Sequence, residues 1–171
     1  MDESAVMREI YLLNVTLHVL AAMLWLGGMF SLAIVGAPVL REVEPAALRA
    51  ALFTRIGRRL RAVGWGAIAV LVATGIGNLA FAGAFRDGRI LRAELWASPY
   101  GHALALKLTA VGVMIVVSGV HDFWLGPLAG RLTPGSPRAL KVRSRAAWLA
   151  RINALIGIIV VFAAVRLARG G

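Results

Sequence analysis

The 171-residue sequence contains no cysteine, and only 8 acidic residues stand against 19 lysines and arginines. The absence of cysteine excludes disulfides, thiolate metal sites and thiol-dependent catalysis. Charged residues make up 16% of the chain, well below the share of about a quarter in an average soluble domain. The sequence also lacks a glycine-rich phosphate loop and a nucleophile elbow, so it carries no motif of the common soluble enzymes.

Apolar residues make up 60% of the chain and are gathered in long blocks. Residues 10–40 and 62–85 contain no charged side chain, and a helix needs only about 20 apolar residues to cross a bilayer. Because lipid offers the backbone no hydrogen bonds, such blocks must be helical. We therefore predict an all-α integral membrane protein, a four-helix bundle that forms one domain over residues 1–171. Its spans are expected at about residues 10–38, 62–84, 100–127 and 148–168.

The basic residues predict the orientation of the bundle. Twelve lysines and arginines lie between the first and second blocks or between the third and fourth, against six on the opposite side. The positive-inside rule then places both of these connections in the cytoplasm and both termini outside a bacterial-type plasma (inner) membrane. We assign the net charge of +11 to contacts with lipid headgroups, and we expect no nucleic acid as a partner.

The first of these basic connections has a helical pattern of its own. Apolar residues recur every four positions, with arginines on the other side: Leu48, Leu52, Ile56 and Leu60. Pro45 suits the start of a helix, so we predict a short amphipathic helix that lies on the cytoplasmic face before the second span. Residues 133–137, which read Thr-Pro-Gly-Ser-Pro, are the clearest turn signal in the chain.

Polar side chains at membrane depth are costly, so their positions carry functional information. Asn14, His18 and Trp25 form one stripe on the first span, and Asn78 lies one turn after Thr74 on the second. All except Trp25 fall in the outer half. We expect His18 to bind a metal or move a proton, with a simple hydrogen bond between helices as the alternative.

On the third span, four residues that could contact a ligand or a charge recur on one face at intervals of seven: Tyr100, Lys107, Met114 and His121. Lys107 is either a counter-charge for a carboxylate or propionate, or a snorkelling side chain. His121 and Asp122 are a ligand site, a proton relay, or an interfacial pair that holds an arginine of the first connection. Asn153 is expected near the cytoplasmic end of the fourth span. His18 and His121 should differ by ~18 Å in depth, which favours two separate sites.

Several segments resemble the CopD copper-resistance family. Residues 17–28 (LHVLAAMLWLGG) resemble its first-helix motif, in which a histidine precedes Trp-x-Gly-Gly by seven residues, as His18 precedes Trp25. Residues 121–127 (HDFWLGP) resemble a signature of the four-helix members, and 58–65 and 74–78 resemble the second helix. The resemblance implies a membrane protein of copper homeostasis or resistance that binds or passes copper, with His18 and His121 as metal ligands.

The related HemJ-type protoporphyrinogen oxidases share a first-helix histidine and a third-helix lysine and are b-haem proteins. This similarity implies an alternative, a b-type haem protein that acts as a quinone-linked or protoporphyrinogen-type oxidoreductase. The cofactor-binding residues would then be Asn14, His18, Trp25 and Lys107, supported by Asn78, Asp122 and Asn153. We assign no catalytic residue and favour a non-enzymatic role, which includes a bundle that supports a larger complex. Expected partners are the lipid bilayer, a second copy of the chain, and a copper-delivering or electron-transfer protein.

Overall fold

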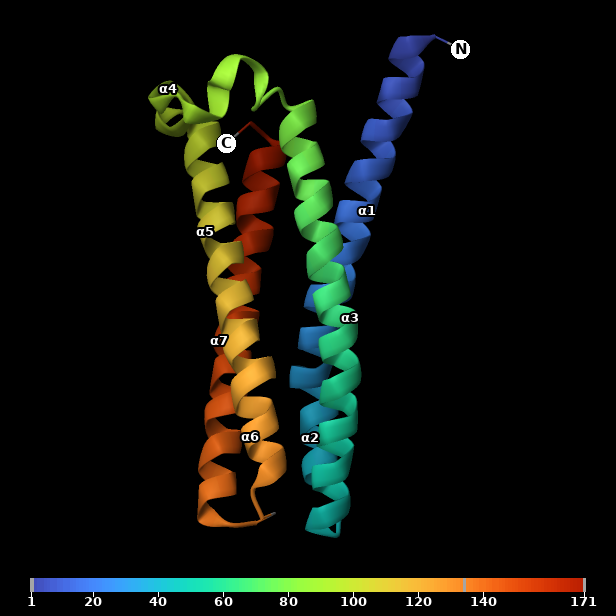
Figure 1. Ribbon diagram of the computed structural model, residues 1–171, viewed down its shortest axis with the longest axis vertical. Helices are drawn as coiled ribbons and strands as arrows, with labels where there is room; N and C mark the ends of the chain where they lie inside the picture. Colours follow the sequence, from blue (N-terminus) through green and yellow to red (C-terminus); the bar gives the residue numbers. More distant parts are fainter. Residues whose placement is uncertain (1, 134, 171) are drawn as a thin grey trace.

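The computed structural model describes residues 2–133 and 135–170, and within them the chain is helical with no strand. Four helical segments run up and down side by side (Figure 1). Their bounds are Glu3–Arg41, Ala46–Phe81, Pro99–Arg131 and Pro137–Ala168. We call the end that holds both termini the terminal end and the opposite end the distal end. The predicted all-α fold is confirmed.

Two of the segments are each made of two helices in line. The first joins α1 (Glu3–Ser31) to α2 (Ala37–Arg41) through a π-helical turn, and the third joins α5 (Pro99–Gly119) to α6 (Gly126–Arg131) in the same way. The second segment is α3 (Ala46–Phe81) and the fourth is α7 (Pro137–Ala168). Between α3 and α5 lie a 3₁₀ turn, Arg86–Leu91, and the short helix α4, Ala93–Ala97.

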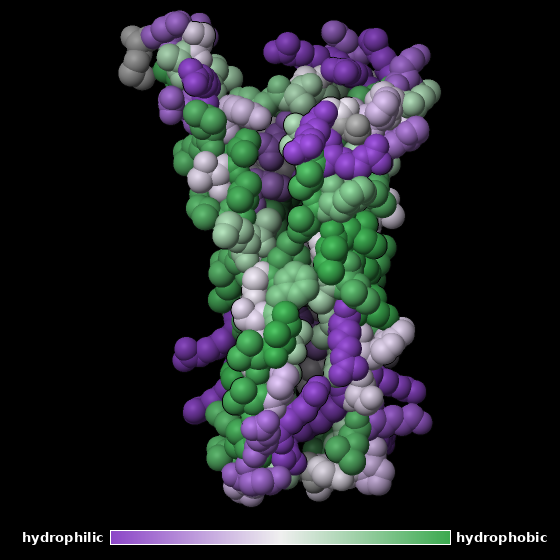
Figure 2. All heavy atoms as spheres, turned by 180° about the vertical axis from the view of Figure 1, so that it is seen from behind, coloured by the Kyte–Doolittle hydropathy of each residue, from purple (hydrophilic) through white to green (hydrophobic). Residues whose placement is uncertain are grey.

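All four segments are long and apolar enough to cross a membrane. Their most apolar stretches have mean hydropathies between 1.6 and 2.2, and no more than 28% of any of these stretches is buried inside the bundle. Apolar side chains dominate the middle of the bundle surface, and polar side chains gather toward both ends (Figure 2). An exposed apolar belt of this kind is favourable only in contact with lipid, so the protein is a multi-pass membrane protein.

The bundle is built from two helix pairs. α1 packs along α3, and α5 packs along α7. The two pairs meet at a core of Trp25, Ala67, Ile68 and Met114, in which Met114 is completely buried. A Cβ at Gly157 would lie 2.8 Å from the Cδ2 methyl of Leu26, so the glycine lets α7 and the Leu26 side chain of α1 pack closely.

The predicted interfacial helix is present as the first turns of α3 and does not form a separate element. α3 runs without a break from Ala46 to Phe81, because no proline interrupts it near residue 62. Along its apolar stripe, Leu60 packs against α1, within 3.6 Å of the position that a Cβ of Gly28 would occupy, and Leu48 at the other end is 47% exposed. The periodicity identified a helix with an apolar face, and a neighbouring helix covers the part of that face around Leu60.

Two helix starts differ from the predicted bounds. α7 begins at Pro137, eleven residues before the expected start, because Ser136 caps it by accepting a 3.2 Å hydrogen bond from the Ala139 N–H. α1 begins at Glu3, with Asp2 as its cap. The Ser4 hydroxyl and then the Ser4 N–H donate to the Asp2 carboxylate, and both hold its pKa below the usual value. Both starts lie outside the apolar blocks, so hydropathy alone placed the ends too far inward.

The two π-helical turns share one sequence pattern. The Ala37 N–H bonds the carbonyl of Leu32, and the Gly126 N–H bonds the carbonyl of His121, five residues back in each case. The following residue is a proline in both segments, Pro38 and Pro127, and proline has no N–H to donate. The carbonyl five residues before each proline is therefore left without its π-helical donor.

Candidate functional site

The polar residues of the first two spans meet between α1 and α3, in the half of the bundle nearer the terminal end. The Asn14 amide donates to the Thr74 carbonyl at 3.0 Å and to the Asn78 side-chain oxygen at 2.9 Å. The His18 Nδ1 atom lies 2.8 Å from the Thr74 hydroxyl. Residues 60 positions apart in the chain thus form one cluster, whose members are half-buried or buried.

The Thr74 hydroxyl has one proton and lies close to two groups that could accept it, the Val70 carbonyl at 2.6 Å and His18 Nδ1 at 2.8 Å. We assign the proton to the Val70 carbonyl, which is the nearer of the two and lies one turn back on the same helix. With this assignment the hydroxyl accepts from His18, and Nδ1 carries the ring proton. In the neutral ring this leaves the lone pair on Nε2, the nitrogen that a metal would bind.

Two glycines of α3 make room for this cluster. A Cβ at Gly77 would lie 2.7 Å from the Asn14 side-chain oxygen, which is closer than real atoms approach. At Gly75 a Cβ would lie 3.6 Å from the His18 ring, an ordinary contact. Gly77 therefore allows the short crossing of α1 and α3, and the crossing brings His18 within hydrogen-bonding distance of Thr74.

Lys107 approaches the cluster from the second helix pair. It is half-buried on α5, and its charge acts electrostatically on the His18 ring. The two residues also occupy equivalent places in their segments, because each lies twenty residues before the proline of its π turn. His18 and Lys107 therefore lie at a similar depth.

Trp25 lies away from this cluster. It is seven residues further along α1, or roughly 10 Å deeper, and only 7% exposed within the apolar core. Its ring packs on α3, where a Cβ of Gly64 would lie 3.7 Å from the indole Cδ1. This environment accounts for Trp25 as a packing residue.

A second polar cluster lies closer to the distal end, around Asp122. His121 Nδ1 lies 2.8 Å from one oxygen of the Asp122 carboxylate, and the Trp65 indole donates to the other at 3.0 Å. The Arg61 guanidinium donates to the backbone carbonyl of Asp122 at 2.8 Å and stacks over Phe123 at 5.6 Å. An arginine near the start of the second span therefore does meet this pair, but at the backbone carbonyl and not at the carboxylate.

The π turn explains why Arg61 binds a backbone carbonyl. In an α-helix the Asp122 carbonyl would accept from Gly126, but that N–H bonds His121. The next donor along the chain would be residue 127, which is a proline. An unpaired carbonyl at membrane depth costs several kcal/mol, and the guanidinium of Arg61 satisfies it. Arg61 thus joins the first helix pair to the second.

Asn153 forms a third polar contact, sixteen residues after the start of α7 at Pro137. It is 4% exposed, and its amide donates to the Ser118 hydroxyl at 2.9 Å and to the Met29 sulfur at 3.3 Å. Its side-chain oxygen has no hydrogen-bond partner in the described part of the chain.

The two histidines belong to different clusters. His18 is bonded by Thr74, whereas the His121–Asp122 pair is bonded by Trp65, nine residues earlier on α3 and therefore roughly 13 Å away along the helix. Among residues 2–133 and 135–170, no three histidine or carboxylate side chains come together as a metal site. A metal at either histidine would need ligands of another kind.

Sequence reasoning did not identify several of these partners. It noted Thr74 without linking it to His18, and it did not single out Trp65, Ser118 or Met29 as partners of the polar residues. One signal was available, since Arg61 and Trp65 lie one turn apart on the same face of α3. The choice of partner, however, depends on which helices are neighbours.

Comparisons with known proteins agree with this architecture. The family described as "Copper resistance protein D" matches residues 54–167, which include all of α5 and α6 and most of α3 and α7, but not α1 with His18. A protein of Aquifex aeolicus (strain VF5) described as "Uncharacterized protein" is 29% identical over 166 residues, 96% of this chain and 97% of that one. No solved structure matches. Because the matched segment covers more than half of the chain, the protein belongs to the copper resistance protein D family.

Proposed function

We propose that this protein handles copper inside the membrane, with the Nε2 atom of His18 as the ligand at the terminal end. The observation that carries the proposal is the hydrogen bond from His18 to Thr74. A histidine that binds a metal usually donates its other ring proton to a fixed acceptor, which sets the tautomer and the direction of the lone pair. The Thr74 hydroxyl, anchored to the Val70 carbonyl, is such an acceptor.

The chemistry of the other donors favours copper as a cargo over a permanently bound metal. Imidazole nitrogen and thioether sulfur both suit copper, and thioether favours Cu(I). The relative depth of each donor can be counted in residues back from the proline of its own segment, Pro38 for the first and Pro127 for the third. On this count His18 lies at 20 residues, Met114 at 13, Met29 at 9 and His121 at 6. Successive donors are thus roughly 5–10 Å apart in depth. This series is compatible with stepwise passage, which requires the two helix pairs to separate around the buried Met114.

Lys107 supports a second candidate, a b-type haem protein. An ammonium group near His18 repels a metal cation but attracts an anionic group such as a haem propionate. In that case His18 would be an axial ligand, held by Thr74 in the same tautomer, and Lys107 would bind a propionate. The haem itself would supply the redox chemistry, and the protein would set its orientation and its access to lipid-soluble reductants.

Metal analysis tests the copper proposal. The purified protein is loaded with Cu(I), desalted and assayed for bound copper and affinity, beside His18→Ala and the control His102→Ala. His102 is exposed and lies in the same half of α5 as Lys107. Replacing it therefore removes an imidazole and leaves the His18 cluster intact. We expect at least about a tenfold loss of affinity for His18→Ala and none for His102→Ala. Equal copper binding by all three proteins would contradict the proposal.

An absorption spectrum decides between the two candidates. Protein expressed with ample haem precursor is purified and scanned for a Soret band in the oxidised and reduced states. A band in the wild type that His18→Ala removes would replace the copper proposal with the haem one. Copper binding without a band leaves copper handling as the function.

A further inference from the structure

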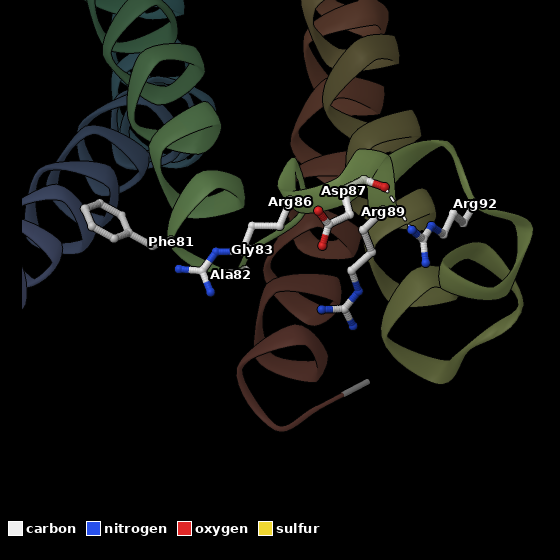
Figure 3. A pocket seen from close by; sticks show the side chains of 7 residues that line it. All are labelled: Phe81, Ala82, Gly83, Arg86, Asp87, Arg89 and Arg92. Atoms are coloured by element: carbon white, nitrogen blue, oxygen red, sulfur yellow. Dashed lines mark hydrogen bonds between the residues drawn. The ribbon is translucent and has the colours of Figure 1, made fainter.

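A hollow lined by arginines lies at the terminal end, where the chain leaves α3. It has a volume of about 320 Å³, and its walls are Phe81, Ala82, Gly83, Arg86, Asp87, Arg89 and Arg92 (Figure 3). A second hollow of about 630 Å³ adjoins it and shares Arg89 and Arg92. Neither hollow belongs to the His18 cluster, and neither is used in the proposed handling of copper.

The loop that carries these arginines is held by a set of hydrogen bonds. The Arg92 guanidinium donates to the Asp87 carbonyl at 3.0 Å, and the Trp96 indole donates to the Ile90 carbonyl at 2.8 Å. The backbone N–H of Ile90 bonds the carbonyl of Ala84 at 2.8 Å. A loop with this many internal bonds presents its side chains in a defined arrangement, which reduces the entropy lost when a ligand binds.

Positive charge exceeds negative charge in the walls of the two hollows. Three arginines and one aspartate line the first, the second adds Glu94, and among the described residues none of these arginines forms a salt bridge with a carboxylate. Figure 3 shows the Asp87 carboxylate between the side chains of Arg86 and Arg89. Arginine guanidinium groups bind phosphate oxygens through paired, charge-assisted hydrogen bonds, so this arrangement suits a phosphate group.

Apolar residues next to the arginines indicate that the phosphate belongs to a lipid. Phe81, in the wall of the hollow, stacks edge-on against Tyr11 of α1 with ring centroids 5.4 Å apart. Leu91 is 87% exposed and Phe85 47% exposed, although both lie among the arginines of the same loop. A free phosphate needs no apolar surface beside it, whereas a phospholipid places its glycerol and acyl chains there.

We propose that the hollow at the terminal end binds the phosphate group of an anionic phospholipid, with Arg86 and Arg89 as its main contacts. Arg92, which the Asp87 carbonyl holds in place, forms the wall between the two hollows. Phe81 and the exposed Leu91 contact the apolar part of the lipid. The site fastens the loop between α3 and α5 to the membrane surface, next to the end of the His18 cluster.

The test compares two double variants of equal charge. Arg86→Gln with Arg89→Gln removes the proposed contacts, and Arg138→Gln with Arg145→Gln removes two exposed arginines of α7 at the distal end. Binding of phosphatidylglycerol, phosphatidylcholine and inorganic phosphate to full-length protein in neutral detergent is measured for both variants and the wild type. Circular dichroism and gel filtration confirm that each variant is folded.

We expect phosphatidylglycerol to bind the wild type more tightly than phosphatidylcholine does. Each arginine near a lipid surface contributes about fivefold to affinity, so the first variant should lose about 25-fold and the second should change less than about twofold. Equal losses in both variants, or no loss in the first, would overturn the proposal. Binding of inorganic phosphate without phosphatidylglycerol would overturn the assignment to lipid and assign the hollow to free phosphate.

Discussion

The two intramembrane histidines use the same ring atom at the same distance but with different partners. His18 Nδ1 meets the Thr74 hydroxyl on another helix, and His121 Nδ1 meets the carboxylate of its neighbour Asp122, each at 2.8 Å. At the terminal half, Thr74 orients the ring while Asn14 and Asn78 tie the same two helices together. In the distal half, Asp122 both orients the ring and joins α5 to α3. Orientation of the ring and cohesion of the helices thus depend on different side chains around His18, whereas Asp122 provides both around His121.

The largest effect is expected from Asp122→Ala. The change removes the acceptor of both His121 and the Trp65 indole, and hydrogen bonds to a charged group are worth about 1.5–3 kcal/mol each. The free energy of unfolding in mixed detergent should fall by about 3 kcal/mol, with Glu42→Ala, an exposed carboxylate, as the control. A fall below about 1 kcal/mol would mean that Asp122 does not hold the distal half together.

A smaller but more specific effect is expected from Thr74→Val. Valine keeps the shape of threonine but removes the acceptor for Nδ1, so the ring can place its proton on either nitrogen. Loss of such a partner typically lowers metal affinity about 10- to 100-fold. Affinity for Cu(I) is the measurement, and Thr74→Ser, which restores a hydroxyl, should recover most of it. Unchanged affinity in the valine variant would remove the main support for His18 as a ligand.

The smallest effect is expected from Pro127→Ala, which tests whether Arg61 stabilises the Asp122 carbonyl that the π turn leaves unpaired. Pro127→Ala supplies an N–H at position 127 that can bond the Asp122 carbonyl, so this carbonyl no longer depends on Arg61. Arg61→Gln should therefore cost about 1 kcal/mol less in the Pro127→Ala background than in the wild type. The measurement is a double-mutant cycle of unfolding free energies in detergent. Equal costs in both backgrounds would show that the carbonyl is not the group that Arg61 stabilises.

The spans could be predicted from the sequence because hydropathy is a local property and because a single apolar segment in lipid must satisfy its backbone hydrogen bonds by forming a helix. Their ends were harder to predict. Ser136 and Pro137 are a recognisable signal for the start of α7. A search for residues without charge does not detect this signal, because Arg138 and Lys141 follow it. The stripe from Leu48 to Leu60 likewise indicated an apolar face correctly, and no local signal says whether lipid or α1 covers it.

For the candidate site, the sequence placed Asn14, His18, Thr74 and Asn78 in the same half of the membrane. It could not pair them, because a hydrogen bond between α1 and α3 depends on the rotation of each helix and on the close approach that Gly77 allows. Asn153 illustrates the same limit, because its partners Ser118 and Met29 come from two other spans.

The sequence by itself determined that this chain is helical, that it crosses a membrane and that imidazole, amide and ammonium groups lie within the bilayer. These properties depend on hydropathy and spacing along one helix. Only the tertiary structure decided which hydroxyl meets the His18 ring, which carbonyl Arg61 satisfies and where three arginines form a hollow. Each of these depends on groups from separate segments brought within about 3 Å of one another or around one space, and no spacing along a single helix specifies that.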